Sequence, residues 1–396
     1  MKLTIPDLSL VVLIGASGSG KSTFARTHFR PTEVLSSDAC RGLVSDDEND
    51  LSATGDAFDI LHYIAGKRLA RGKLTVVDAT NVKREDRKPL VDLARRYHVI
   101  PVAIVLNVPE RLAHERNRQR PDRNFGPHVV RNHLQQMRRS LGGLKKEGFR
   151  HVSVLGSPQE IAEVEIERQP LWNNRTAEHG PFDIIGDVHG CADELEELLR
   201  VLGYEVVSDT TGQSPWGTPL YRHPADRKAV FLGDLVDRGP HILDTVRLVR
   251  GMVEAGDALS VPGNHDMKLM RKLRGRDVQI THGLDTTLTE FDALPNDVRP
   301  TFISELANFL DGLVSHYVFD DGRLVVAHAG MKEEMQGRGS GRVRDFALYG
   351  ETTGETDEFG RPVRYDWAAD YRGKAIVVYG HTPVPEPQWL NHTINI

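Results

Sequence analysis

The amino-acid sequence predicts an α/β protein built from two domains, residues 1–170 and 171–396. Three observations support this prediction. A glycine-rich loop lies between an apolar strand and an amphipathic helix at residues 15–23, and periodicity is lost between residues 157 and 180. Beyond that gap, several apolar strands end in histidine, aspartate or asparagine. A chain of 396 residues is also too long for one ordinary domain. We therefore expect a first domain with a parallel sheet and a second α/β domain with its own site.

The composition is that of a globular protein in a reducing compartment. The sequence is 39% hydrophobic and 27% charged, and no apolar run approaches the roughly 20 residues of a membrane helix. Only Cys40 and Cys191 are present, which gives no disulfide framework and predicts a cytoplasmic location. The net charge of −6 gives a nucleic-acid partner no general support, so such a partner would need a local basic surface. We expect no membrane association.

The first domain opens with a phosphate-binding loop. Residues 11–14 are apolar and are expected to form a strand buried on both faces. The next nine residues fit the pattern G-x-x-x-x-G-K-[ST] and lead into a helix. In this pattern backbone N–H groups surround the β- and γ-phosphates, Lys21 adds positive charge, and Ser22 holds Mg²⁺. The residues expected to bind ATP with Mg²⁺ are Gly15, Ser17, Gly18, Ser19, Gly20, Lys21, Ser22 and Thr23.

Further strands at residues 34–38, 75–78 and 99–106 alternate with helices, as in a doubly wound sheet whose site lies at the strand C-termini. The strand at 34–38 ends in Asp38, which we predict to be the general base of a kinase that phosphorylates an alcohol. The alternative is a helix N-cap without a catalytic role. Asp78 fits a role in positioning metal or water as well as it fits a structural one.

Residues 111–123 form an arginine-rich segment. Arg116 and Arg120 are one helical turn apart and share a face, and Arg123 follows just past Pro121. We predict that this helix closes over the nucleotide, with Arg116 and Arg120 acting on the transferred phosphoryl group and Arg123 binding the nucleotide. A solvated arginine face is the alternative.

The second domain is expected to contain strands at residues 183–186, 229–232, 259–262, 324–327 and 375–379, with a hairpin at 318–323. Carboxylate, amide and imidazole side chains follow these strands. The expected metal ligands are Asp187, His189, Asp234, Asn264, His328 and His381. This is the ligand set of a two-metal phosphohydrolase, and its mixed character favours Mn²⁺, Fe or Zn²⁺ over Ca²⁺. We expect two divalent ions, with Mn²⁺ as the first choice.

The boxes GDVHG, GDLVDRGP, GNHD, HAG and GHTP resemble those of the calcineurin-like metallophosphoesterase family, which implies an α/β sandwich. By this resemblance Asp187 and His189 hold one metal, Asp234 bridges, and Asn264, His328 and His381 hold the second. The resemblance also implies that Arg238 binds the substrate phosphate and that His265 is the general acid, oriented by Asp237. That last pairing is sound chemistry as well, because a histidine needs a partner that fixes its tautomer.

A P-loop kinase followed by a metallophosphoesterase resembles bacterial polynucleotide kinase–phosphatase over essentially the whole chain. The resemblance implies that the first domain transfers the γ-phosphate of ATP to a 5′-OH end. The second would remove a 2′,3′-cyclic phosphate or a 3′-phosphate, which prepares RNA for ligation. RNA ends are the expected partner, with DNA ends and a homodimer left open. Members of that family continue into a ligase domain, and no K-x-D-G motif occurs here, so we expect a ligase domain or partner outside this chain.

Two other functions stay open on the sequence. One is a small-molecule kinase fused to a dinucleotide polyphosphatase or a protein phosphatase, because such hydrolases share the boxes of the second domain. The other is a nucleotide-sensing module without catalysis, which is the weaker alternative because both sites contain the residues that their chemistry needs.

Overall fold

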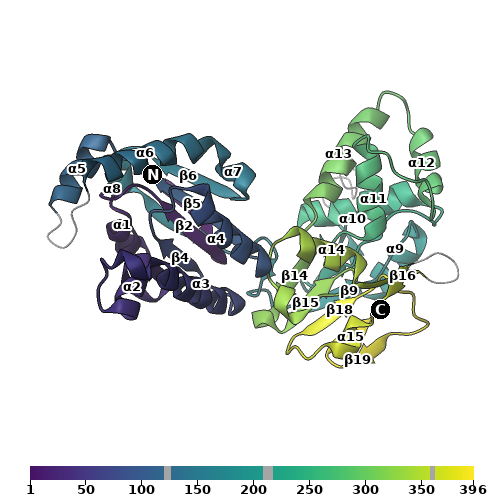
Figure 1. The fold of residues 1–396 in the computed structure, drawn as a ribbon. Coiled ribbons are helices and arrows are strands. Elements are labelled where there is room, and N and C mark those ends of the chain that lie inside the picture. The colour runs from purple at the N-terminus through teal and green to yellow at the C-terminus, as the bar shows by residue number, and fades with distance from the viewer. Residues whose placement is uncertain (120–125, 208–216, 357–361) are drawn as a thin grey trace. The chain divides into compact units, whose positions relative to one another are not determined.

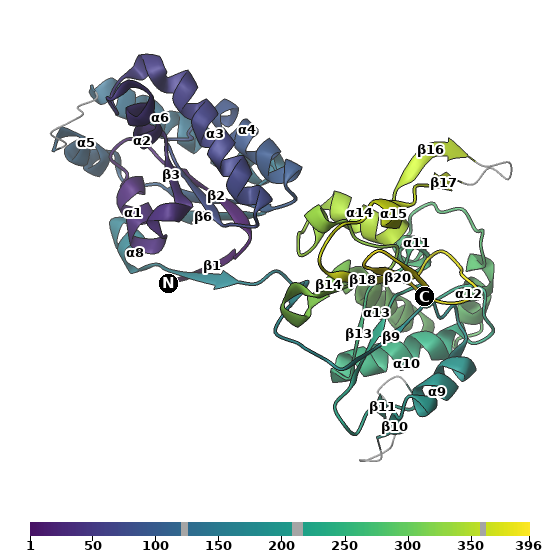
Figure 2. The same ribbon diagram turned by 90° about the horizontal axis from the view of Figure 1, so that it is seen from below.

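The computed structural model describes residues 1–119, 126–207, 217–356 and 362–396. It separates into two compact units, which Figure 1 and Figure 2 show from two directions. The first unit contains Met1–Leu171 and Arg338–Ser340, and the second contains Trp172–Gly337 and Gly341–Ile396. Each unit has its own sheets and its own hydrophobic core.

The first unit is built on a five-stranded parallel sheet with the strand order β3-β4-β2-β5-β6. The strands are β2 (Ser9–Ile14), β3 (Val34–Ser36), β4 (Thr75–Asp78), β5 (Ile100–Leu106) and β6 (His151–Leu155). Every residue of the two central strands β2 and β5 is buried, which explains their continuous apolar sequence. Alternate residues of β2 pack into different cores, Val12 and Ile14 into one and Val11 and Leu13 into the other.

Helices connect these strands, as the sequence predicts. They are α1 (Lys21–His28), α2 (Ser37–Ser45), α3 (Thr54–Ala70), α4 (Arg84–Arg96), α5 (Glu110–Arg118), α6 (Pro127–Ser140) and α7 (Leu144–Glu147). Because all five strands are parallel, their carboxyl ends share one edge of the sheet. The loop after β2, the start of α2 after β3 and the segment leading to α5 after β5 all leave from that edge.

Residues 157–180 are not the irregular linker that the sequence predicts. They form α8 (Pro158–Glu163), β7 (Glu165–Gln169) and β8 (Asn174–Arg175). Ser157 caps α8 by accepting a hydrogen bond from the backbone of Glu160, and β7 pairs in parallel with β1 (Lys2–Pro6). Four of the five residues of β7 are exposed, so it shows no apolar alternation, and its pairing with the start of the chain leaves no local signal.

The second unit is a sandwich of two sheets. One has the parallel order β13-β12-β9, and the other has the order β19-β20-β18-β15-β14-β8. Their strands are β9 (Phe182–Ile185), β12 (Lys228–Phe231), β13 (Ala258–Ser260), β14 (His316–Phe319), β15 (Leu324–Ala327), β18 (Ile376–Tyr379), β19 (Gln388–Leu390) and β20 (Thr393–Asn395). One buried core lies between the two sheets. It contains Val230 and Val261 from the three-stranded side and Phe319, Val326 and Val378 from the six-stranded sheet. The predicted hairpin is present as the antiparallel pair β14–β15.

Helices cover both outer faces of this sandwich. The three-stranded sheet shares a core with α9 (Ala192–Val201), α10 (Ile242–Ala255), α11 (Asn264–Leu273), α12 (Leu284–Asp292) and α13 (Arg299–Gly312). The six-stranded sheet packs on α14 (Gly341–Tyr349) and α15 (Trp367–Asp370). Short pairs β10 (Glu205–Val206) with β11 (Tyr221–Arg222), and β16 (Thr352–Thr356) with β17 (Pro362–Arg364), complete the unit. Within the described ranges, none of the helices combines the length and the apolar character needed to cross a bilayer.

Candidate functional site

The phosphate-binding loop joins β2 to α1 in the first unit. Gly18 and Gly20 have φ angles of 80° and 96°, and a Cβ atom on Gly18 would lie 2.3 Å from the carbonyl oxygen of Ala113. A side chain is therefore excluded at Gly18 by both backbone conformation and space. Lys21 Nζ donates to the carbonyl oxygens of Gly15 and Ala16, at 2.8 Å and 3.0 Å, so the lysine lies folded along its own loop.

This loop fits a phosphate group. Ser19 Oγ is buried and has no hydrogen-bond partner among the described residues, so it is available to a ligand. Ser17 is also buried, Ser22 is half-buried and Thr23 is exposed at the start of α1. A helix N-terminus with successive backbone N–H groups is the usual environment of a bound phosphate.

Asp38 lies in the first turn of α2 and not at the end of a strand, which corrects the sequence prediction. Nor is it the N-cap, because Ser36 Oγ accepts the capping hydrogen bond from Ala39 at 3.4 Å. The Asp38 carboxylate pairs with Arg41 at 2.8 Å, and the Arg41 side chain is almost fully buried. Sequence reasoning missed Arg41, although its i, i+3 spacing from Asp38 is a usable signal. Asp78 ends β4 as predicted and is buried.

Arg116 contacts the phosphate-binding loop. Its Nη1 atom lies 3.3 Å from the position that a Cβ atom on Gly20 would take, so α5 brings a guanidinium group to the loop. The next residue, Asn117, is buried and accepts a hydrogen bond from Ser17 at 3.5 Å. Arg120 and Arg123 lie outside the described residues.

A buried ion pair supports the same edge of the sheet. Arg87 of α4 is fully buried and makes two hydrogen bonds to the Glu147 carboxylate, at 2.8 Å and 2.7 Å. Its Nη1 atom also donates to the carbonyl oxygen of Asn81 at 2.9 Å. The amide of Asn81 in turn donates to the carbonyl oxygen of Leu13, next to the end of β2. No pattern in the sequence indicates this network.

In the second unit, five strand ends from both sheets supply the predicted metal ligands. Asp187 and His189 follow β9, Asp234 follows β12, and Asn264 begins α11 after β13. His328 directly follows β15, and His381 comes two residues after β18. Asn264 and His265 are thus the first two residues of α11.

The backbone at these strand ends is strained. The non-glycine residues of the site with left-handed φ angles are His189 (46°), Asp234 (48°), Asp237 (72°), Arg238 (73°) and His381 (69°). Such a conformation costs about 1–3 kcal/mol at each position. Residues held in that conformation cluster at functional sites, where the surrounding structure fixes them.

Asp234 stands at the centre of the ligand set. Asp234 is buried, and its Oδ2 atom lies 3.7 Å from His189 Nε2 and 3.6 Å from His328 Nε2. Two groups of side chains could hold a metal ion here, one with His189 and His265 and one with His328 and His381, and Asp234 belongs to both. This position is the one that a bridging carboxylate would occupy.

The donor atoms fit divalent metal ions. His328 Nδ1 lies 2.9 Å from the carbonyl oxygen of Leu232, which can only accept, so this nitrogen carries the hydrogen. His328 Nε2 then faces Asn264 Oδ1 at 3.1 Å and His381 Nδ1 at 2.9 Å. Burial is the main reason why the pKa of His381 is lowered to about 3, and the nearby His328 and Arg364 lower it further. The ring of His381 is therefore neutral. Convergence of these donors on one point is typical of a metal site.

His189 and Asp187 complete the centre. His189 Nδ1 lies 2.8 Å from the carbonyl oxygen of Val236, which leaves Nε2 to face Asp234. Asp187 Oδ1 accepts a hydrogen bond from the backbone of His381 at 3.3 Å and lies 3.6 Å from His328 Nδ1. The structure therefore brings together all six ligands that the sequence predicts.

His265 contacts Asp237 through one ring nitrogen and Arg238 through the other. Its Nδ1 atom donates to Asp237 Oδ2 at 2.6 Å, and Thr287 Oγ1 donates to the other oxygen of Asp237 at 2.5 Å. Arg238 Nη2 lies 3.3 Å from His265 Nε2. Burial by itself would lower the pKa of His265, but the hydrogen bond to Asp237 and the charge of Asp234 outweigh it and raise the pKa.

His265 also belongs to one of the two ligand groups, so metal binding is the competing role. The hydrogen bond to Asp237 occupies Nδ1, so Nε2 is the ring nitrogen that either role would use.

Three residues of this site were not predicted from the sequence. Asp266 is fully buried and accepts hydrogen bonds from the backbone of Leu235 at 2.9 Å and of Gly263 at 2.8 Å, so it ties two ligand loops together. Thr287 orients Asp237 from α12, far along the chain. Arg364 donates to Thr382 Oγ1 at 2.6 Å, next to His381. Asp266 stands inside the GNHD box, so the box itself was the available signal for it; Thr287 and Arg364 lie in no motif.

Comparison with known proteins divides the chain in the same way. The family model described as AAA domain matches residues 10–144, and the model described as calcineurin-like phosphoesterase matches residues 180–385. These two matches confirm the predicted fold class of a P-loop kinase domain followed by a metallophosphoesterase domain.

Two curated relatives carry the name bis(5′-nucleosyl)-tetraphosphatase PrpE [asymmetrical]. The one from Geobacillus sp. (strain WCH70) is 46% identical over 215 residues, which are 54% of this chain and 84% of the relative. The one from Bacillus subtilis (strain 168) is 45% identical over 215 residues, with the same two shares. Among solved structures, a chain of the Pnkp1/Rnl/Hen1 RNA repair complex is 14% identical with a TM-score of 0.32, covering 66% of this chain and 81% of that chain.

Proposed function

Because the chain belongs to the calcineurin-like phosphoesterase family, we propose that its second domain hydrolyses phosphate esters at polynucleotide ends. We further propose that its P-loop domain phosphorylates 5′-OH ends, so that the chain heals both ends of a broken RNA. The second domain would act on a 2′,3′-cyclic phosphate or a 3′-phosphate.

The observation that carries this proposal is the presence of both sites in one chain. The first has a phosphate-binding loop with Arg116 against it and Asp38 on the same edge of the sheet. The second has two ligand groups that share Asp234. The tetraphosphatase relatives leave almost half of this chain unmatched, so their name offers a function for one part of the chain only.

In the kinase reaction, the Asp38 carboxylate accepts the proton of the attacking hydroxyl group and orients its oxygen toward the γ-phosphate. Lys21 and Arg116 oppose the negative charge that develops on the transferred group. Arg120 and Arg123 are proposed to add to this charge from the segment that follows α5.

In the phosphoesterase reaction, two divalent metal ions, which we propose to be Mn²⁺, would activate water and polarise the phosphoryl group. Arg238 binds an oxygen of the phosphate through its guanidinium group. His265 gives its Nε2 proton to the leaving oxygen, while Asp237 stabilises the ring through Nδ1. Asp187, His189, Asp234, Asn264, His328 and His381 would hold the metal ions.

The test is a single incubation of the whole chain with ATP, Mn²⁺ and an RNA that carries a 5′-OH and a 2′,3′-cyclic phosphate. We expect a 5′-phosphate and a 3′-OH. Lys21→Ala should abolish the 5′ product and keep the 3′ product, and Asp187→Ala should do the reverse. An RNA that returns with both ends unchanged would contradict the proposal.

A second candidate is hydrolysis of bis(5′-nucleosyl) tetraphosphates, which the identity of 46% over 84% of a relative with that name favours. The same metal centre and the same proton donor would serve an anhydride as well as an ester. The ratio of kcat/KM for diadenosine tetraphosphate to that for an RNA 3′-phosphate end separates the two. A ratio far above one would favour the dinucleotide.

A further inference from the structure

A groove leads away from the metal ligand His381. A cavity of about 280 Å³ is lined by His381, Thr382 and Arg364, and it extends to Tyr365. A second cavity, of about 560 Å³, lies next to it, and Glu351, Tyr365 and Trp367 line both. The two cavities therefore adjoin along these shared residues, and the larger one has the size of a typical small-molecule site.

Arg364 stands at the metal end of this groove. Its guanidinium donates to Thr382 Oγ1 at 2.6 Å, and the carbonyl oxygen of His381 lies 3.5 Å away. Arg364 thus presents a cation directly beside the loop that carries His381, and it is distinct from Arg238.

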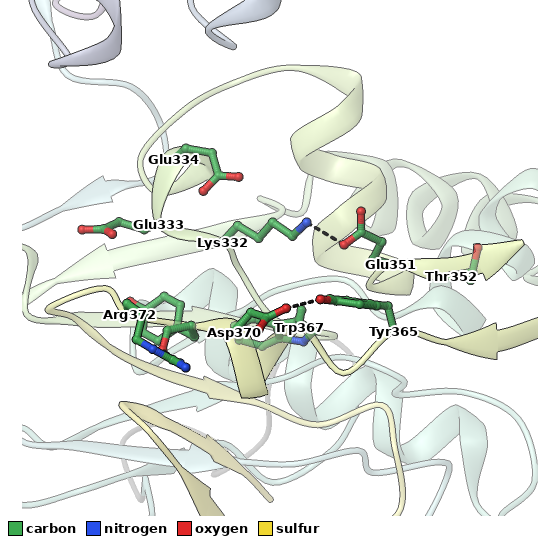
Figure 3. A pocket seen from close by; sticks show the side chains of 10 residues that line it. Lys332, Glu333, Glu334, Glu351, Thr352, Tyr365, Trp367, Asp370 and Arg372 are labelled. Carbon is green, nitrogen blue, oxygen red and sulfur yellow. Dashed lines mark hydrogen bonds and ion pairs between the residues drawn. The ribbon is translucent and has the colours of Figure 1, made fainter.

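Tyr365 forms the junction between the two cavities. Its side chain is 42% exposed, yet its hydroxyl group donates to the Asp370 carboxylate and its backbone N–H donates to Glu351 at 2.8 Å. Figure 3 shows the Tyr365–Asp370 pair on one side of the larger cavity and the Lys332–Glu351 pair on the other. An aromatic ring that is exposed but fixed in orientation suits stacking on a flat ligand.

The charged side chains around the larger cavity disfavour the binding of a polyphosphate there. Four carboxylates line it against two cationic side chains, namely Glu333, Glu334, Glu351 and Asp370 against Lys332 and Arg372. A polyphosphate would be repelled here, whereas carboxylates accept hydrogen bonds from ribose hydroxyl groups and from base amino groups. The groove thus offers a cation near the metal ligands and an aromatic, hydrogen-bond-accepting pocket farther away.

We propose that this groove is the nucleoside subsite of the phosphoesterase domain. Arg364 binds an oxygen of the phosphate that is being removed, and the ring of Tyr365 stacks on the base of the nucleoside that carries it. The inference rests on the proposed function and deepens it, because it assigns the substrate class as a phosphate attached directly to a nucleoside.

The test compares adenosine 3′-monophosphate with glycerol 2-phosphate, which has no ring to stack, using the whole metal-loaded chain. Tyr365→Ala should raise KM for the nucleotide about tenfold, which is the usual effect of losing one stacked base. It should leave kcat/KM for glycerol 2-phosphate within about twofold, and Tyr365→Phe, which keeps the ring, should stay near wild type. Free adenosine should inhibit hydrolysis of glycerol 2-phosphate, with an inhibition constant that also rises about tenfold in Tyr365→Ala.

Arg364→Ala has a different expected pattern, because both substrates carry a phosphate. It should lower kcat/KM for both by about tenfold and leave the inhibition constant of adenosine unchanged. The matched controls are Tyr63→Ala, an exposed tyrosine of the first unit, and Arg323→Ala, an exposed arginine paired with Asp320. Neither control should change phosphatase kinetics.

Equal losses on both substrates in Tyr365→Ala, or no inhibition by adenosine, would overturn the subsite. If Tyr365→Ala does not fold, Tyr365→Leu keeps the apolar bulk and gives the same comparison. RNA 3′-phosphate ends that are hydrolysed with an unchanged KM in the Tyr365 variant would overturn the subsite but keep the proposed function. Hydrolysis of adenosine 3′-monophosphate that responds to Tyr365, without any hydrolysis of RNA ends, would keep the subsite and overturn the proposed function.

Discussion

Replacing His265 with alanine tests whether this side chain is a proton donor or a metal ligand. The imidazole and the Asp237 carboxylate are both buried and lie 2.6 Å apart. Burial alone would lower the pKa of His265, but this hydrogen bond and the charge of Asp234 raise it, so the imidazole stays protonated to a higher pH than a free histidine. General acid catalysis of this kind contributes about 10²–10⁴ in rate.

The size of the loss should depend on the leaving group. An alcohol leaves only with a proton, so His265→Ala should lower kcat for a nucleoside 3′-monophosphate by about 10²–10⁴. A p-nitrophenolate leaves without help, so the loss with that substrate should stay below about tenfold. An exposed histidine of the same unit, His392, provides the matched control, and His392→Ala should affect neither substrate.

Asp237→Asn gives the pH dependence. The hydrogen bond to the Asp237 carboxylate raises the pKa of His265, so loss of the carboxylate should lower this pKa. A general acid must be protonated, so the activity on nucleotides should be lost at a lower pH than in the wild type.

The decisive assay measures kcat over a series of leaving groups, together with the metal content of each variant by mass spectrometry. A steeper dependence on the leaving group in His265→Ala, with two metal ions retained, supports the proton donor. Equal losses for all leaving groups, accompanied by loss of a metal ion, would refute the reasoning and make His265 a ligand.

Four other predictions concern the support of the two sites. Gly263→Ala would place a Cβ atom 2.0 Å from Asp234 Oδ1, so we expect phosphatase activity to fall by a factor of about 10². A fully active variant would show that the position of Asp234 does not matter for activity. Asp234→Asn should weaken the binding of both metal ions, since Asp234 belongs to both ligand groups, and calorimetry that shows one site intact would exclude bridging. Glu147→Gln should lower the unfolding free energy of the first unit by about 3–5 kcal/mol, measured by urea denaturation, because it leaves the buried Arg87 without its carboxylate. Burial lowers the pKa of His316 to about 3, so the unfolded chain takes up this proton first as the pH falls. The contribution of neutral His316 to the unfolding free energy is fully present above its unfolded pKa of 6.5. The unfolding free energy should therefore decrease by about 2 kcal/mol between pH 7 and pH 5, and His316→Gln should remove this pH dependence.

The residues proposed as metal ligands could be grouped from the sequence because they belong to strand ends. His189, Asp234 and His328 each stand within four residues of a buried strand, and the carboxyl ends of strands in this sandwich meet at one place. Once the strands are predicted correctly, the positions of such residues relative to one another follow. Asp38 shows the limit of this reasoning, because a shift of two residues moved it from a strand end into the first turn of a helix.

Residues whose partners are distant in the chain gave no such signal. Thr287 reaches Asp237 across 50 positions, and Arg364 reaches Thr382 across 18 from a hairpin outside every motif. The pairing of β1 with β7 joins segments about 160 residues apart, and the exposed residues of β7 hide its periodicity. Each of these contacts depends on the three-dimensional arrangement of whole elements, which local patterns do not contain.

The strained backbone of the metal centre is held by the protein itself. The N–H group of His189 donates to the carbonyl oxygen of Asp234 at 2.8 Å, and the N–H group of Gly239 donates back to the carbonyl oxygen of His189 at 2.8 Å. The loops after β9 and β12 therefore fix one another, and Asp266 ties the loop after β12 to the loop after β13. Left-handed conformations that cost about 1–3 kcal/mol each are thus offset by hydrogen bonds between the loops themselves. Side chains held in this way are preorganised, as the proposed metal-dependent chemistry requires.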